Sequence, residues 1–178
     1  MLDKLESRRK ESKRGKGKAA ALVGKTWVTR RGVKVDRIST AWMIRRFIDS
    51  GARFRLIDAA SESKRGGEIS FDMAQADFTH DGDRCTFESL LREVGPRDAA
   101  LEKVAQIVHD IDLKDGKFGR PETPGVQRLL EGILETSADD DGRLTRGFEL
   151  FDQLYESFRR TGSNRETSGK RTRKANAR

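Results

Sequence analysis

The segment 36–49 reads DRISTAWMIRRFID and has the clearest helical pattern in the chain. Six of its side chains recur near helical spacing: Ile38, Ala41, Trp42, Ile44, Arg45 and Ile48. Residues three and four apart share one face of an α-helix. Asp36 is suited to the N-cap, and Gly51 is a natural stop. We therefore predict a helix over 37–49.

Short runs of β-type residues surround this helix. The segments predicted as strands are 26–30, 53–58, 69–73 and 77–79, and the tetrapeptide 80–83 (HDGD) is typical of a turn. The remainder is helical in pattern, with helices predicted over 86–94, from Asp98 to about Asp115, around 124–133 and over 140–160. The fold class predicted is α+β and helix-dominated: a single domain with a small sheet of short strands in the N-terminal half, followed by three to four helices.

The basic charge of the chain is concentrated at its two ends. The 178 residues carry a net charge of +8, while segments 1–25 and 161–178 carry +6 and +5. Both segments have almost no large apolar residue, so we predict two disordered basic tails around a folded domain over 26–160. Weak nonspecific attraction to nucleic acid is one interpretation of the tails, and a solubilising extension is the other.

Several classes of protein are disfavoured by the composition. No apolar run approaches the roughly 18 residues of a membrane span, and no apolar segment follows the basic start as in a secretory signal. The single cysteine, Cys85, cannot form an internal disulfide. A cytoplasmic protein without membrane partners is expected.

The two histidines of the chain each lie in a dense polar string. His80 begins HDGDRC, which ends at Cys85, and His109 begins HDIDLKD, which contains Asp112. Imidazole, thiolate and carboxylate are ligands of zinc, iron and manganese sites. His109 and Asp112 are three residues apart on a predicted helix and share a face. These four side chains are therefore candidate metal ligands, while hydrogen bonding of His109 and Asp112 within a packed helix is the alternative.

Arginines near the start of the first predicted helix suggest an anion site. Arg37 lies at that helix start and Arg30 at the end of the preceding strand. Guanidinium groups, backbone amides and the helix dipole together favour a tetrahedral oxyanion. Ion pairs with the plentiful carboxylates are an equally good interpretation of these arginines.

Four strings of the chain resemble a known family. They are WVTR with VDRI and AWMIRRFID (27–49), FTHDGDRCTFE (78–88), IVHDIDLKD with KF (107–118), and FDQLY (151–155). Together they resemble the C-terminal domain of the chromate-resistance protein ChrB family, over about 26–160. The resemblance implies a role in bacterial chromate resistance, and it adds support to His80, Cys85, His109 and Asp112 as a metal site and to Arg37 as an anion contact.

The function expected is that of a chromate-response module in a stress response, which senses or handles chromate or a similar oxyanion through a bound metal. Cys85 is the candidate redox group. Two alternatives stay open: a small metalloenzyme acting on a thiol, a peroxide or a small acid, and a nucleic-acid-associated regulator that uses the basic tails. No catalytic residue is assigned from the sequence.

Overall fold

The computed structural model describes residues 17–58 and 62–175, with side chains as far as Thr161. Three strands, β1 (Thr26–Arg30), β2 (Arg53–Ile57) and β3 (Ile69–Ser70), form a parallel sheet in the order β2-β1-β3. Trp27 pairs with Phe54 on one side and Ile69 on the other. The predicted strand at 77–79 is reduced to a single bridge between Phe71 and Phe78.

The helix predicted over 37–49 is present in two parts. It consists of α2 (Val35–Met43) and a π-helical continuation, η1 (Ile44–Ile48), which together connect β1 to β2. The N-cap is Lys34, so the assignment of Asp36 to that position was wrong. Asp36 lies inside the first turn, where its carboxylate accepts hydrogen bonds from the start of a different helix.

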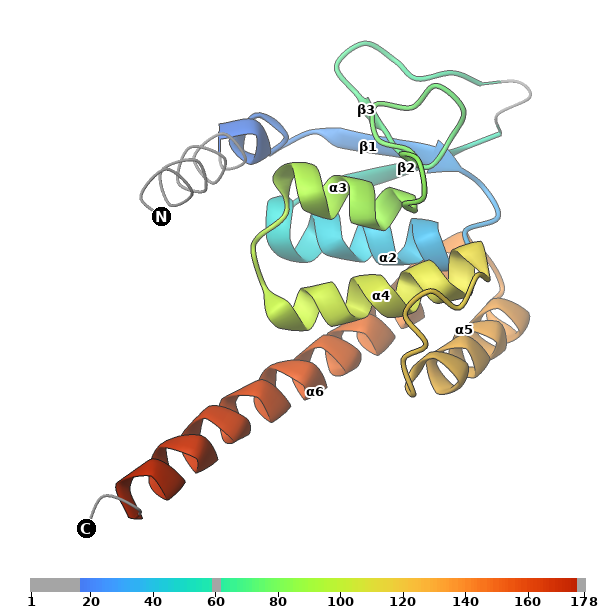
Figure 1. Cartoon of the computed structure of the whole chain (residues 1–178). Coiled ribbons are helices and arrows are strands. Elements are labelled where there is room, and N and C mark those ends of the chain that lie inside the picture. Colours follow the sequence, from blue (N-terminus) through green and yellow to red (C-terminus); the bar gives the residue numbers. More distant parts are fainter. Residues whose placement is uncertain (1–16, 59–61, 176–178) are drawn as a thin grey trace.

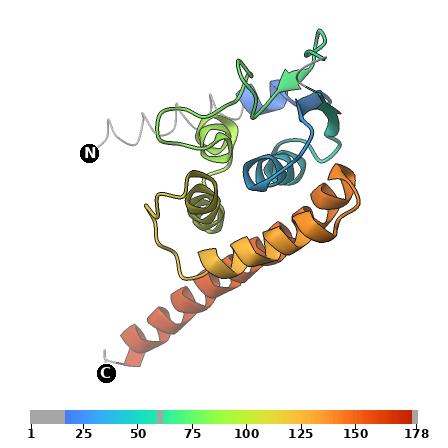
Figure 2. The same cartoon turned by 90° about the vertical axis from the view of Figure 1, so that its right-hand side faces the viewer.

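Four helices follow β3 in the described part of the chain: α3 (Thr86–Val94), α4 (Ala99–Leu113), α5 (Thr123–Thr136) and α6 (Asp140–Ala175). Helices α2 to α6 lie on one side of the sheet (Figures 1 and 2). The predicted class, α+β and helix-dominated with a small N-terminal sheet, is confirmed. Trp42 is fully buried, and its ring packs against those of Phe87, Phe151 and Tyr155.

Much of the predicted tail 1–25 lies outside the described residues. In the second predicted tail, 161–178, the backbone of α6 continues to Ala175, but the side chains beyond Thr161 are outside the described part. Disorder of the tails and their attraction to nucleic acid stay predictions. Among the residues described, no helix combines the length and apolar character that crossing a bilayer requires.

The crossing of α2 and α6 depends on a glycine. Gly147 is buried in α6, and a β-carbon at this position would collide with the side chain of Ile38 in α2. Gly132 in α5 also lies within a helix, but a β-carbon there would meet no atom within 4 Å. The two glycines therefore differ in whether the fold requires them.

We expect Gly147→Ala to destabilise the protein by about 1–3 kcal/mol, because overpacking forces the two helices apart. Gly132→Ala is the matched control and should stabilise it by up to about 1 kcal/mol, because alanine is the better helix former. Urea unfolding followed by circular dichroism measures both changes. Equal changes in the free energy of unfolding for the two substitutions would show that α2 and α6 do not approach each other closely at Gly147.

Candidate functional site

A polar cluster lies at the carboxyl ends of the parallel strands β1 and β3. The chain leaves β1 and enters α2, whose first turn carries Asp36. It leaves β3 at Ser70, and Asp72 follows two residues later. Because the two strands are parallel, both exits are at the same edge of the sheet, the edge at which parallel sheets commonly bind ligands.

His80 is the centre of this cluster. Its Nε2 atom lies 3.2 Å from Oδ2 of Asp36, 3.4 Å from Oδ2 of Asp112 and 3.8 Å from Oδ1 of Asp72. The four residues come from α2, the loop after β3, the loop before α3, and α4. We refer to Asp36, Asp72, His80 and Asp112 as the carboxylate–histidine cluster.

Asp36 is the most enclosed member of the cluster, with a side chain that is 3% exposed. Its Oδ2 accepts a hydrogen bond from the Thr86 amide at 2.8 Å, and its Oδ1 accepts one from the Phe87 amide at 2.9 Å. These two amides begin α3, where a negative charge is favoured. The interactions fix the carboxylate in place although it faces two other acidic groups.

Negative charge in the cluster exceeds positive charge. Arg37 pairs with Asp72 at 3.0 Å between Nε and Oδ2, which sets one guanidinium against three carboxylates. Burial and then the charge of Asp36 raise the pKa of Asp112 to about 6. The same two causes raise the pKa of Asp72. An imidazolium or a metal ion at this point would relieve the repulsion.

The hydrogen bond to Asp36 and the surrounding carboxylates raise the pKa of His80. The carboxylate oxygens that face Nε2 favour a proton on this nitrogen when no metal is bound. A metal ion would take the place of that proton, and Nε2 would then become a ligand.

The spacing of these donor atoms fits one metal ion. Ligands held at about 2.0–2.2 Å from an ion lie roughly 3–3.5 Å from one another. The separations of Nε2 from the Asp36 and Asp112 oxygens, 3.2 and 3.4 Å, fall in that range. Asp36, His80 and Asp112 can therefore act as ligands, while Asp72 is already engaged with Arg37 and the Thr86 hydroxyl.

The structure places His109 in a second group, apart from His80. His109 is fully buried; its Nδ1 lies 2.6 Å from Glu88 and its Nε2 lies 3.2 Å from Asp115. Burial by itself would lower the pKa of His109, but the hydrogen bonds to Glu88 and Asp115 outweigh it and raise the pKa. Asp110 beside it accepts the Phe118 and Gly119 amides and so holds the loop after α4.

Of the four ligands predicted from the sequence, His80 and Asp112 are brought together. His109 has its own carboxylate partners, and the groups of potential ligands found among the described residues do not include Cys85. Cys85 is fully buried at the N-cap of α3. Burial, together with the charge of Asp36, raises the pKa of its thiol far above the ordinary value, which keeps the thiol protonated at neutral pH.

The two predicted anion contacts have different surroundings. Arg37 is largely buried and held by Asp72 and by the carbonyl oxygen of Gly32, to which its Nη1 donates at 3.1 Å. Arg30 is exposed at the end of β1. Arg37 thus lies at the cluster as an ion-pair partner of a carboxylate, which is the alternative interpretation of its role.

Sequence reasoning missed Asp36 and Asp72 as site residues. Asp36 was assigned to a helix cap, and Asp72 lies in a run interpreted as a strand. One available signal was the position of Asp36 directly after a β-strand and loop, where parallel sheets place functional groups. Asp72 has a φ angle of 47°, unusual for a non-glycine residue, but only the structure reveals it.

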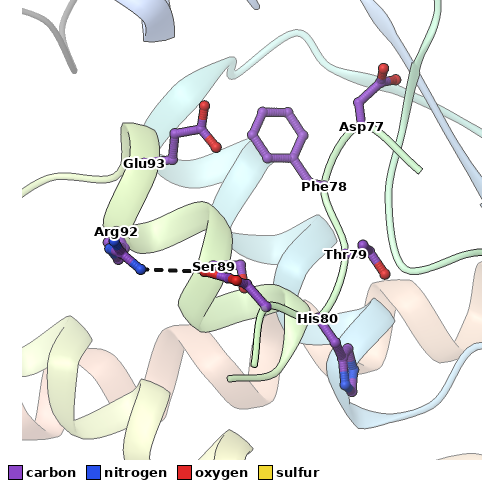
Figure 3. A pocket seen from close by; sticks show the side chains of 8 residues that line it. Asp77, Phe78, Thr79, His80, Ser89, Arg92 and Glu93 are labelled. Carbon is purple, nitrogen blue, oxygen red and sulfur yellow. Dashed lines mark hydrogen bonds and ion pairs between the residues drawn. The ribbon is translucent and has the colours of Figure 1, made fainter. Parts of the chain in front are cut away.

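A pocket of about 400 Å³ adjoins the cluster at His80. Figure 3 shows His80 at one end of it, below Thr79 and Ser89, with Phe78 and Arg92 farther along. The His80 side chain is 42% exposed, against 3% for Asp36. The cluster is therefore closed on its Asp36 side and open to solvent at His80.

The fold and the cluster define a small α+β domain with a candidate metal centre at the carboxyl ends of its parallel strands. The chain belongs to the family described as ChrB, C-terminal domain, whose model matches residues 27–158. It is 36% identical over 136 residues to Protein ChrB of Cupriavidus metallidurans. This match covers 76% of the chain but only 41% of that relative. No solved structure matches the chain.

Proposed function

We propose that this protein is a chromate-response module that binds one divalent metal ion in the carboxylate–histidine cluster and meets the oxyanion there. The observation that carries the proposal is the convergence of three carboxylates on Nε2 of His80, within 3.2–3.8 Å. Three negative charges and one guanidinium leave an excess that a divalent cation would neutralise. The link of the ChrB family to chromate resistance supports the choice of oxyanion.

The donor set of two carboxylates and one imidazole suits manganese, ferrous iron and zinc. Oxygen ligands suit magnesium, calcium and manganese, while an imidazole adds affinity for later transition metals. Asp36 and Asp112 supply oxygen and His80 supplies nitrogen. Mn²⁺ is the practical probe, since its paramagnetic signal distinguishes free from bound ion.

The open side of the cluster supports contact with an external ligand. With three protein ligands and partial exposure at His80, a bound ion would keep positions for water or an anion. Chromate is a tetrahedral dianion and can bind such an ion through oxygen. Arg37 would add positive charge near it, although its guanidinium is shared with Asp72.

The test is a titration of the full chain, stripped of metal, with Mn²⁺ at pH 7.5, followed by electron paramagnetic resonance. We expect one bound Mn²⁺ per chain. Chromate added to the Mn²⁺-loaded protein should then bind, with sulfate as the competing anion of the same shape and charge. Failure to bind Mn²⁺, Fe²⁺ or Zn²⁺ would overturn the metal site. Equal chromate binding with and without metal would show that the oxyanion does not bind at the metal ion in the cluster.

A further inference from the structure

One carboxylate belongs both to the cluster and to the start of α3. Oδ2 of Asp36 is the cluster oxygen nearest to Nε2 of His80, at 3.2 Å, and the same atom accepts the Thr86 amide at 2.8 Å. Its Oδ1 accepts the Phe87 amide. Whatever holds Asp36 in the cluster therefore also holds the first turn of α3.

A second connection runs through Asp72. The Thr86 hydroxyl donates to Oδ1 of Asp72 at 3.2 Å, and this oxygen faces His80. Thr86 thus contacts two members of the cluster, one through its amide and one through its hydroxyl. If the start of α3 moved away, the carboxylate of Asp36 would lose the two amides that fix its position.

Cys85 lies directly before this turn. Its thiol is fully buried, and its backbone amide donates to Oε2 of Glu88 within the first turn of α3. A reagent can reach the thiol only after this turn opens, in a local or a global unfolding event. The next residue, Thr86, donates its amide to Asp36 at 2.8 Å, so Cys85 lies beside the cluster.

We propose that metal occupancy of the carboxylate–histidine cluster controls the opening of the first turn of α3 and with it the exposure of Cys85. The inference rests on the proposed function, since it requires a metal ion in the cluster. A ligand that binds only the closed state lowers the population of the open state by the factor 1 + [L]/Kd. Asp36 is the positioning residue, because it contacts both the site of the ion and the amides of α3.

The test is the rate of alkylation of Cys85 by N-ethylmaleimide, followed by mass spectrometry on the full chain. Cys85 is the single cysteine of the sequence, so every adduct reports this position. Mn²⁺ at 100 times its Kd should slow alkylation about 100-fold. In Asp112→Asn, which removes a candidate ligand without touching α3, the same Mn²⁺ concentration should have little effect.

A separate control distinguishes local from global opening. Asp98→Ala lowers global stability by removing the N-cap of α4, at the opposite end of that helix from Asp112. Local opening predicts that this substitution leaves the alkylation rate of the metal-free protein unchanged. If the alkylation rate instead rose by the factor that corresponds to the loss in the free energy of unfolding, alkylation would proceed through global unfolding, and the inference would be overturned.

The remaining outcomes separate the two proposals. Mn²⁺ binding without a change in the alkylation rate would overturn the control of Cys85 and leave the metal site standing. The absence of alkylation in the metal-free protein would also overturn the control of Cys85, because it would show that the first turn of α3 does not open. The metal site would again stand. The absence of metal binding would overturn both.

Discussion

Asp112→Asn is expected to weaken Mn²⁺ binding by about 100-fold or more, because it removes a charged ligand from the carboxylate–histidine cluster. The asparagine has nearly the same shape, so the packing of α4 should not change. Asp112 is the suitable position for this substitution, since it makes no hydrogen bond to the start of a helix, whereas Asp36 does. Titration with Mn²⁺ measures the loss.

The same substitution should stabilise the metal-free protein above pH 6. Burial and the charge of Asp36 raise the pKa of Asp112 from 3.8 to about 6 in the folded state. Between these values the folded protein holds a proton that the unfolded chain has released, so stability falls as the pH rises from about 4 to 6. After allowance for the partial exposure of the side chain, the change is about 1–2 kcal/mol.

Asp112→Asn removes this part of the pH dependence, and urea unfolding at pH 4, 6 and 8 measures it. His80 acts in the same direction at higher pH. Its raised pKa contributes stability below about pH 6.5, and this stability is lost as the pH rises through the pKa of His80 in the folded protein.

Asp141→Asn, at an exposed position in the first turn of α6, is the matched control. It should keep full Mn²⁺ affinity and change stability by no more than about 0.5 kcal/mol. Equal Mn²⁺ affinities in the two variants would exclude Asp112 as a ligand.

Asp36→Ala is expected to have the largest effect on stability, a loss of about 3 kcal/mol. It leaves the buried amides of Thr86 and Phe87 without acceptors, and each unsatisfied buried group costs about 1–3 kcal/mol. Relief of the repulsion between Asp36 and Asp112 offsets part of this cost. Urea unfolding gives the free energy, and the amide resonances of Thr86 and Phe87 give the local change.

Asp98 provides the comparison, since it is an ordinary N-cap of α4. Its Oδ1 accepts the Ala100 and Leu101 amides, and its Oδ2 accepts the Tyr155 hydroxyl. Asp98→Ala should cost about 1–2 kcal/mol, as caps of this kind do. A smaller loss for Asp36→Ala than for Asp98→Ala would show that the start of α3 does not depend on Asp36.

The secondary structure could be predicted from the sequence where its cause is local. The helix around Trp42 and the helix that ends near Asp112 have apolar side chains at intervals of three and four, and burial of one face is enough to favour a helix. The segment 77–79 could not be assigned reliably, because a strand depends on the partner with which it pairs. Here that partner is Phe71, and the pairing is a single bridge.

Residue type alone identified His80 and Asp112 as candidate ligands and also suggested His109 and Cys85. On a helix, His109 and Asp112 differ by about 60° in direction, which is enough to face different neighbours. His109 meets Glu88 and Asp115, while Asp112 meets His80. This choice of neighbours depends on how α4 packs, and no spacing within one segment encodes it.

The sequence by itself determined the fold class, the family and the residue types available for chemistry, because periodicity, composition and motif are properties of neighbouring residues. The tertiary structure decided which of them meet. Asp36 and His80 are 44 positions apart, and they come together because β1 and β3 are parallel and end at the same edge of the sheet. Asp36 appeared to be a cap of its own helix, but packing directed its carboxylate to α3, where unpaired amides attract a negative charge.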